Sequence, residues 1–245
     1  MKIRQYIPNA ITTLNLTCGL VSVSLILENS FVYASLFIFL ASVFDFFDGM
    51  AARLLDARSE FGKQLDSLSD MVSFGVAPGI LMFRILSVHF AQGTGMAGQW
   101  QVIPYFALLI PICSALRLAR FNIDIRQETC FIGMPTPAIA IFFASIPLVV
   151  FLQDRIFTLI RLDFLILFLS NPKVLAVLVV FFSYMLVSDF RLFSMKFKTV
   201  DWKTNQTRYI FLILTLVLVL LFSISAIPLA IIMYLFLSLI FQKQI

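Results

Sequence analysis

Runs of twenty or more residues without a charged side chain recur along this chain. The first covers residues 5–27, and the longest covers residues 209–242. At a rise of about 1.5 Å per residue, the first run would form a helix of about 34 Å, enough to cross a hydrocarbon core of about 30 Å. With 61% hydrophobic residues, 13% charged residues and a mean hydropathy of +1.00, the composition is that of a polytopic membrane protein.

The apolar pattern predicts an all-α fold, a polytopic transmembrane helical bundle of about eight spans. Short alternating segments, which a membrane β-barrel requires, are nearly absent. The run 209–242 is too long for one crossing, and we expect Pro228 to divide it into a hairpin. Segment 156–170 is expected to lie at the far interface, because Arg161 and Asp163 interrupt its apolar run. The remaining spans are expected near residues 5–27, 31–53, 66–88, 102–121, 136–153 and 173–190.

Residues 5–27 are interpreted as the first span and not as a removed signal peptide, because they lack a small-residue cleavage site and contain polar side chains such as Asn9 and Thr12. Basic residues then set the orientation, since cytoplasmic loops carry more Lys and Arg. With both termini on the cytoplasmic side, the basic residues Arg155, Arg161 and Lys173 fall outside. Those on or near the inner side are Lys2, Arg4, Arg53, Arg58, Lys63, Arg117, Arg120, Arg126, Arg191, Lys196, Lys198, Lys203, Arg208 and Lys243.

Four aspartates interrupt the apolar pattern between residues 45 and 70. Asp45 and Asp48 are three residues apart and Asp66 and Asp70 are four apart, so each pair lies on one face of its helix. A charge near the bilayer centre costs roughly 2.5 to 3.5 kcal/mol on insertion scales. Carboxylates without His or Cys are the ligands of Mg²⁺, Mn²⁺ or Ca²⁺. The four aspartates therefore predict a metal site.

Small residues and one arginine accompany these acids. Gly49 shares a face with Asp45, Ala52 with Asp48, and Gly62 with Asp66, which predicts room for a large ligand. Arg53 follows about two turns after Asp45, where a guanidinium can clamp phosphate oxygens.

Together these positions read D-x-x-D-G-x-x-A-R-x8-G-x3-D-x3-D, which resembles the signature of the CDP-alcohol phosphatidyltransferases at every defined position. Members of that family are integral membrane enzymes that bind a CDP-activated lipid through its diphosphate and two metal ions, after which an alcohol attacks the lipid-side phosphorus and CMP leaves. The resemblance implies CDP-diacylglycerol as a substrate and two Mg²⁺ or Mn²⁺ ions at Asp45, Asp48 and Asp66. It also implies that Asp70 helps to position a metal and acts as the catalytic base.

A further polar group lies at the start of the first predicted span. Pro and Asn near a first helical turn also suit a simple helix entry. Similar P-N-x-x-T-x-x-N segments in the family help to hold the nucleotide, and Asn and Thr can read a cytosine edge by hydrogen bonds. The residues expected to bind the CDP-lipid are Pro8, Asn9, Thr12, Asn15, Gly49, Ala52, Arg53 and Gly62.

Three later motifs, S-D-x-x-S-F-G-x-A-P, L-R-L-A-R-F-N and G-x-P-x-P, resemble the serine-using branch of the family, the phosphatidylserine synthases. The first predicts a kink between Ser73 and Pro78. In the second, arginines at a cytoplasmic helix end are commonly topology anchors, but Arg117 and Arg120 share a face and can grip a carboxylate or phosphate. The resemblance implies L-serine as acceptor, bound by Arg117, Arg120 and Asn122.

Other functions remain open. The same chemistry could use glycerol 3-phosphate or inositol phosphate as acceptor, although these need further cations for a second phosphate. A membrane cation transporter also uses intramembrane aspartates, but it does not require Gly49, Ala52, Arg53 and Gly62 at these offsets. Structural ion pairs alone do not explain the acids, because residues 45–70 contain six acidic residues and only three basic ones, Arg53, Arg58 and Lys63.

The organisation expected is a catalytic membrane domain over residues 1–200, followed by a transmembrane hairpin over residues 201–245. We expect an integral protein of a bacterial-type cytoplasmic membrane, with the active site facing the cytoplasm. The net charge of +5 is attributed to topology and to attraction by anionic headgroups, and nucleic acid is not expected as a partner. The resemblance implies a homodimer.

Overall fold

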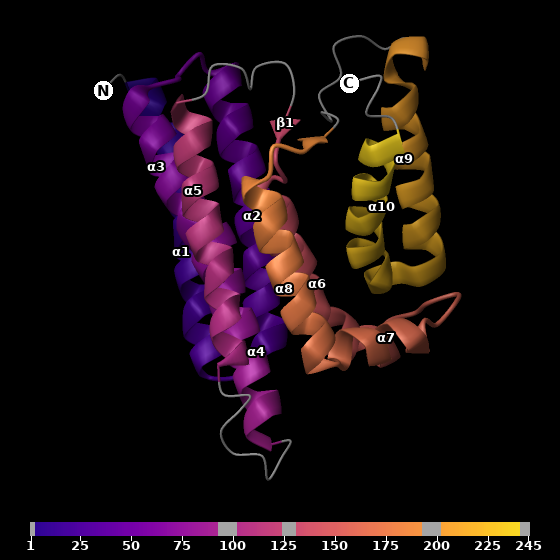
Figure 1. The fold of residues 1–245 in the computed structure, drawn as a ribbon. Helices are drawn as coiled ribbons and strands as arrows, with labels where there is room; N and C mark the ends of the chain where they lie inside the picture. The colour runs from indigo at the N-terminus through magenta and orange to yellow at the C-terminus, as the bar shows by residue number, and fades with distance from the viewer. Residues whose placement is uncertain (1–2, 93–101, 124–130, 193–201, 241–245) are drawn as a thin grey trace.

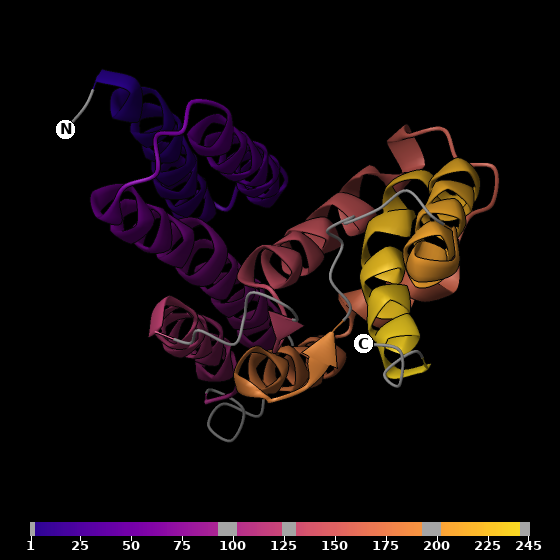
Figure 2. The ribbon, with the colours of Figure 1, turned by 90° about the horizontal axis from the view of Figure 1, so that it is seen from above.

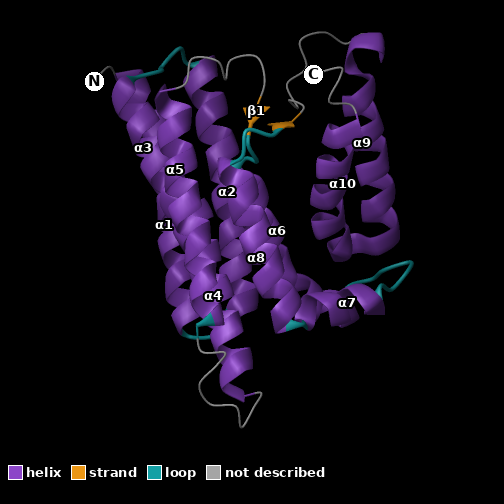
Figure 3. Ribbon diagram, in the orientation of Figure 1, coloured by secondary structure: helices purple, strands orange, loops and turns teal. Residues whose placement is uncertain are grey.

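The computed structural model describes residues 3–92, 102–123, 131–192 and 202–240. Within these ranges the chain is helical, apart from two short strands that form one antiparallel ladder (Figure 1, Figure 3). The prediction of an all-α membrane bundle is confirmed. The elements are η1 (Ile3–Gln5), α1 (Tyr6–Leu27), α2 (Phe31–Leu54), α3 (Glu60–Asp70), η2 (Met71–Val76), α4 (Ala77–Gln92), η3 (Ile103–Leu108), α5 (Leu109–Ile123), β1 (Phe131–Ile132), α6 (Thr136–Leu152), η5 (Gln153–Arg155), α7 (Asp163–Ser170), α8 (Pro172–Val187), β2 (Arg191–Leu192), α9 (Trp202–Phe222), η6 (Ser223–Ser225) and α10 (Ala226–Ile240).

Helices α1 and α2 form an antiparallel hairpin with an extensive interface. Small buried residues let the two backbones approach, as is usual between membrane helices. Ser22 Oγ on α1 donates to the carbonyl of Ala34 on α2 at 2.9 Å, so the hydroxyl is satisfied across the interface. The turn uses Asn29 at φ 58°, a conformation that Asn tolerates better than most residues. The hairpin brings the start of α1 beside the end of α2.

One helical run of 31 residues, Glu60–Phe90, joins α3, η2 and α4. It begins six residues before the predicted boundary at residue 66, because Ser59 caps it by accepting a hydrogen bond from Gly62 N at 3.0 Å. The predicted kink between Ser73 and Pro78 takes the form of the π-helical segment η2. Pro78 has no N–H to close an α-helical turn onto residue 74, and wider π turns accommodate such breaks.

Helix α5 lies against the same run because two glycines make room for it. A Cβ on Gly75 would lie 3.1 Å from Ser114 Cβ, and one on Gly79 would lie 2.6 Å from Pro111 Cδ. Side chains at these two positions would push α5 outwards. The inner face of α5 is thereby held close to the end of α3.

The G-x-P-x-P motif at the start of α6 has a backbone explanation. Gly133 has φ 74°, and a Cβ there would lie 2.7 Å from the carbonyl oxygen of Leu186. Its N–H donates to the carbonyl of Phe190 at 2.9 Å, beside the β1–β2 ladder. Below it, Phe142, Phe143 and Phe182 pack with ring centroids 4.3 to 5.7 Å apart and join α6 to α8.

The long uncharged run forms the hairpin α9–α10, and α10 packs against α6, as Figure 2 shows from above. The prediction that Pro228 makes the break was wrong in position, because the chain turns at Ser223–Ser225, with Ser223 at φ 50°. Pro228 is the third residue of α10, in the first turn, where proline is tolerated. Ser225 Oγ donates to Gln153 Oε1 at 2.9 Å, which ties this turn to the end of α6.

Five helical segments of the described residues are long and apolar enough to cross a membrane, or six if the bent pair α7–α8 is one span. Helix α6 has 17 residues and is shorter. Helix α7 has eight residues, about 12 Å, and is bent by 79° from α8, so it cannot cross alone. The total of about eight spans therefore stays a prediction. The cytoplasmic location of both termini also stays a prediction.

Candidate active site

Three helix ends and one tight loop meet at one end of the bundle, at the top of Figure 1. The loop between α2 and α3 is fixed by backbone hydrogen bonds from Leu55 N to Ala51 O and from Ala57 N to Ala52 O, both 3.0 Å. Asp56 takes φ 46° within it. The loop therefore holds the end of α2 beside the start of α3, and the α1–α2 hairpin adds the start of α1.

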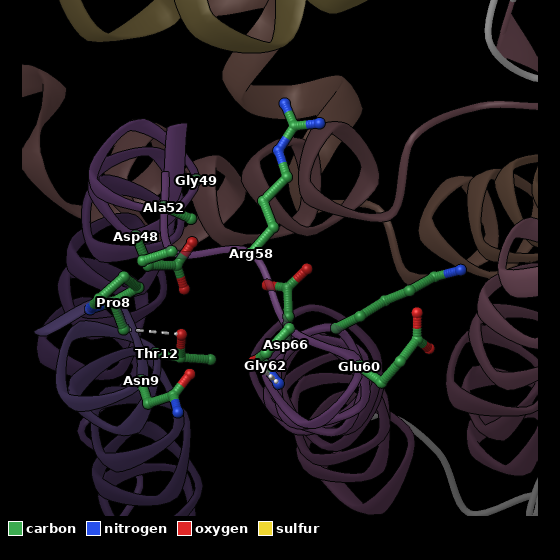
Figure 4. Close-up of a pocket in the computed structure, with 13 residues that line it drawn as sticks. Pro8, Asn9, Thr12, Asp48, Gly49, Ala52, Arg58, Glu60, Gly62 and Asp66 are labelled. Atoms are coloured by element: carbon green, nitrogen blue, oxygen red, sulfur yellow. Dashed lines mark hydrogen bonds between the residues drawn. The ribbon is translucent and has the colours of Figure 1, made fainter. Parts of the chain in front are cut away.

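Three of the four predicted metal ligands meet there. Asp45, Asp48 and Asp66 each offer one carboxylate oxygen, and these oxygens all lie within 4.8 Å of one another. Asp48 and Asp66 project into the space between α2 and α3 (Figure 4). Asp48 Oδ2 and Asp66 Oδ1 are buried and have no hydrogen-bond partner within the described structure.

This arrangement fits a hard divalent cation. Oxygens that share one ion at about 2.0 to 2.6 Å lie no more than about 5 Å apart, and the cluster meets that limit. Buried carboxylate oxygens without donors are destabilising unless a cation compensates them. In the described parts of the chain, neither Lys nor Arg forms an ion pair with these three aspartates. The donor set, spacing and unpaired oxygens agree with the metal prediction.

Asp70 lies one turn further along α3 and is outside the group of three. The residue is 9% exposed, and Asn15 Nδ2 on α1 donates to its Oδ1 at 3.2 Å. Asp45 is close enough to interact with Asp70 as well as with Asp48 and Asp66. The four predicted residues are therefore arranged as a group of three carboxylates and one deeper carboxylate that accepts a hydrogen bond from Asn15.

A cavity of about 550 Å³ opens beside Asp48 and Asp66 (Figure 4). It contains most of the residues predicted to bind the CDP-lipid, but neither Asn15 nor Arg53. Asn15 lies deeper, at Asp70. The residues that line the cavity are Pro8, Asn9, Thr12, Asp48, Gly49, Ala52, Ala57, Arg58, Ser59, Glu60, Gly62, Lys63 and Asp66.

The two glycines of the motif have different roles. A Cβ on Gly62 would lie 3.1 Å from both Asn9 Oδ1 and Ser59 Oγ, so this glycine allows α1 to approach α3. A Cβ on Gly49 would meet no other atom within 4 Å. Gly49 therefore keeps cavity space open that the protein itself does not fill.

The cations at the cavity differ from the predicted one. Arg53 is exposed, and its Nε donates to the carbonyl of Gly49 at 2.9 Å on its own helix. Arg58 and Lys63 line the cavity instead. The Arg58 guanidinium points away from Asp48 and Asp66 (Figure 4). Arg58 and Lys63 lie close to Gly62 of the motif in sequence, and this proximity could have indicated that they line the cavity.

The residues predicted to bind serine or phosphate separate into one buried and two outer positions. Arg117 is 7% exposed, its Nε has no partner among the described residues, and it lies in electrostatic range of Asp70. Arg120 is exposed, donates to the carbonyl of Val187 at 3.1 Å and lies 3.7 Å from Asp189.

Asn122 belongs to the contact between α5 and α3. Its Nδ2 donates to Ser67 Oγ at 2.9 Å, and its carbonyl accepts from Lys63 Nζ at 3.1 Å. Both partners are on α3, so Asn122 helps to hold α5 in place. Of the three predicted residues, Arg117 is the one directed into the interior beside Asp70.

Comparison with known proteins agrees with this site. Residues 5–170 match the model of the family described as CDP-alcohol phosphatidyltransferase. The CDP-diacylglycerol–serine O-phosphatidyltransferase of Bacillus subtilis is 36% identical over 191 residues, which are 76% of this chain and 89% of that protein. The protein of the same name from Helicobacter pylori is 30% identical over 212 residues, 86% of this chain and 80% of that one.

A relative with a different name is similar over a somewhat shorter stretch. The archaetidylserine synthase of Methanothermobacter thermautotrophicus is 34% identical over 175 residues, 69% of this chain and 70% of that protein. The family match spans α1 to α7 and so includes the carboxylate cluster, the cavity and Arg117. The chain belongs to the CDP-alcohol phosphatidyltransferase family.

Proposed function

We propose that this membrane enzyme transfers the phosphatidyl group of CDP-diacylglycerol to the hydroxyl of L-serine, giving phosphatidylserine and CMP. The observation that carries the proposal is the group of three carboxylates, within 4.8 Å of one another, beside a cavity large enough for a nucleotide diphosphate. The relatives from Bacillus subtilis and Helicobacter pylori are named as serine O-phosphatidyltransferases, and these names support serine as the acceptor.

In the proposed reaction, the serine hydroxyl oxygen bonds to the lipid-side phosphorus, and the bond from that phosphorus to the bridging oxygen breaks. CMP leaves with the bridging oxygen, and the hydroxyl proton passes to a base. The family uses divalent metal, and two Mg²⁺ or Mn²⁺ ions at Asp45, Asp48 and Asp66 would neutralise the diphosphate charge.

The cavity residues are assigned to the nucleotide. Asn9 Nδ2 is buried and has no partner in the described structure, so it is available as a donor to the ligand. Thr12 Oγ1 donates to the carbonyl of Pro8 at 3.0 Å (Figure 4), and its oxygen remains able to accept. Arg58 and Lys63 supply positive charge at the opening.

Serine is placed at the deeper end, between Asp70 and Arg117. Asp70 is held by Asn15 Nδ2 and is proposed as the base that receives the hydroxyl proton. The buried guanidinium of Arg117 has an unpaired Nε and suits the serine carboxylate. An acceptor with an additional phosphate would need more cations, and Arg120 is already engaged with Val187 and Asp189. This favours serine over glycerol 3-phosphate and inositol phosphate.

We also propose a location and an orientation for the enzyme. The carboxylate end of the bundle would face the cytoplasm at a bacterial-type cytoplasmic membrane, where CDP-activated lipid and soluble serine are both accessible. Two copies of the chain would form a homodimer. The excess of basic residues near that end supports this orientation.

The test is an assay of the purified protein with CDP-diacylglycerol, Mn²⁺ and one acceptor at a time. We expect CMP release with L-serine and formation of phosphatidylserine, with much slower release for glycerol 3-phosphate and inositol phosphate. If CMP were released faster with glycerol 3-phosphate or inositol phosphate than with serine, that compound would be the acceptor and the proposal of serine would be wrong. No CMP release with any acceptor, combined with Mn²⁺ flux into vesicles, would favour a cation transporter.

A further inference from the structure

Two adjoining cavities lie at the end of the bundle away from the carboxylates. The first, about 410 Å³, is bordered by the turn between α1 and α2 and by the end of α6. The second, about 290 Å³, lies among α4, α6, α7 and α8. Phe31 and Phe151 line both, so the two cavities share a wall. Their volumes are in the range of small-molecule sites.

This pair of cavities is remote from the active site. Phe31 begins α2 and Asp48 is seventeen residues later on the same helix, which corresponds to about 26 Å. In Figure 1 the α1–α2 turn lies at the bottom of the bundle and the carboxylate end at the top. Because α2 is long enough to span the membrane, the two sites lie near opposite membrane surfaces.

The first cavity has a cationic polar rim. Arg155 lines it together with Asn29 and Ser30, and none of its described lining residues is an acid. Arg84 Nε donates to Asn29 Oδ1 at 3.0 Å, which places a second guanidinium next to the rim. Such a rim attracts a phosphate group.

The second cavity is suited to a hydrocarbon chain. Its described lining residues are apolar apart from His89 and Ser170, and the ring of His89 is paired through Nδ1 with the carbonyl of Ile85 at 2.9 Å. A soluble anion would contact only the polar rim, and an acyl chain alone would make no contact that requires Arg155. A phospholipid has both an anionic phosphate for the rim and an acyl chain for the apolar cavity.

The position of Arg155 is fixed by its neighbours. Gln153, in the same turn η5, is 3% exposed, and its Oε1 accepts from Ser225 Oγ at 2.9 Å. This buried hydrogen bond anchors the turn to the α9–α10 hairpin. Arg155 therefore projects from a fixed backbone at the cavity rim.

We propose that these two cavities bind one anionic phospholipid from the leaflet opposite to the active site, with its phosphate at Arg155 and one acyl chain in the apolar cavity. Such a lipid cannot be a substrate, because the carboxylates are about 26 Å away. It would instead stabilise the contact of α2 with α6.

The test uses delipidated full-length protein in an uncharged detergent. Bound lipid is counted by native mass spectrometry and the melting temperature is measured by circular dichroism, with phosphatidylglycerol, phosphatidylcholine or inorganic phosphate added. We expect phosphatidylglycerol to bind and to raise the melting temperature, and the other two to have little effect. Arg155→Gln should weaken phosphatidylglycerol binding at least about tenfold. Val88→Phe, which fills the apolar cavity, should weaken it as well.

The matched control is Arg161→Gln, which removes the same charge from the same connecting segment but does not line either cavity. It should bind phosphatidylglycerol as the unchanged protein does. The inference is overturned if Arg155→Gln binds the lipid as well as this control, or if inorganic phosphate alone reproduces the stabilisation. CMP release should be the same in all three variants, so this outcome is independent of the proposed function.

Discussion

At the scale of single residues, the site holds buried charged groups in which one hydrogen-bonding atom lacks a partner. Asp48 Oδ2, Asp66 Oδ1 and Arg117 Nε are all buried without partners in the described structure. Leaving one such group unpaired typically costs about 1 to 3 kcal/mol, and more when it is charged. Asp48 and Asp66 line the cavity and Arg117 lies near Asp70, and the proposed function assigns a cation and a substrate as their partners.

The assignment of Asp70 as base can be tested by Asp70→Asn. The amide keeps the shape and can still pair with Asn15, but it cannot accept the serine proton. We expect turnover to fall by about 10²-fold or more, with CDP-diacylglycerol binding retained. CMP release gives the first quantity, and equilibrium binding of the CDP-lipid gives the second. Full activity in this variant would refute the assignment.

Gly49 provides a test of the cavity that separates binding from folding. Gly49→Ala should keep or slightly raise stability, because alanine is favoured over glycine within helices by up to about 1 kcal/mol and its Cβ meets no protein atom. Gly49→Leu should fill the cavity and raise the KM for CDP-diacylglycerol about tenfold or more. Melting temperatures and KM values are measured together. An unchanged KM for Gly49→Leu would show that the lipid diphosphate does not use this space.

Residue spacing anticipated that three of the carboxylates lie close together. The intervals within the two helices placed Asp45 with Asp48 and predicted that Asp66 would face them. Asp70 interacts with Asp45 but is not part of the group of three, and it accepts a hydrogen bond from Asn15, which is 55 residues away in sequence. Local spacing cannot show such a contact. For the same reason, spacing grouped Arg117 with Arg120, whereas contacts with Val187 and Asp189 draw Arg120 outwards.

At the scale of elements, helix existence was easier to predict than helix ends. Hydrophobic runs located α1, α2, α6 and α8 closely, and the predicted span 102–121 corresponds to η3 together with α5. Long apolar runs are informative because a helix that lies in a membrane needs an apolar surface along its length. The start of α3 at Glu60 was missed, although Ser59 followed by Gly62 is a readable cap. The ladder between β1 and β2 had no sequence signal, since two residues are too few for a periodic pattern.

The Gly133 turn makes a prediction at this scale. Gly133→Ala places a Cβ 2.7 Å from the carbonyl of Leu186 at φ 74°, so the ladder and the start of α6 must shift. A loss of about 1 to 3 kcal/mol of stability is expected. Thermal unfolding in detergent measures it, with Gly49→Ala as the control for adding a methyl group at a glycine. Equal melting temperatures for both variants would contradict this explanation of the motif.

At the scale of the whole molecule, the bundle separates two ends of different chemistry, and the C-terminal hairpin packs on α6. The division into a catalytic domain over 1–200 and a hairpin over 201–245 stays a prediction, as does the homodimer. Sequence could predict the hairpin from the length of its uncharged run, but not its contact with α6, because that contact depends on Ser225 and Gln153, which are 72 residues apart.

The hydrogen bond between Ser225 and Gln153 predicts that substitutions of these two residues have non-additive effects on stability. Ser225→Ala leaves the buried side chain of Gln153 unpaired and should cost about 1 to 3 kcal/mol. Adding Gln153→Leu should recover part of that loss, because both polar groups are then removed. Melting curves of the two single variants and the double variant measure the coupling. Additive losses would mean that the hairpin is not held through this pair.

The central claim is that Asp45, Asp48 and Asp66 hold divalent cations against the lipid diphosphate. The most direct measurement is a crystal structure of the protein with Mn²⁺ and CDP-diacylglycerol, with data collected at the manganese absorption edge. We predict anomalous peaks among these three carboxylates, with the diphosphate in the cavity that Asn9 and Gly49 line. Peaks elsewhere, or carboxylates without manganese in crystals whose protein releases CMP, would contradict it.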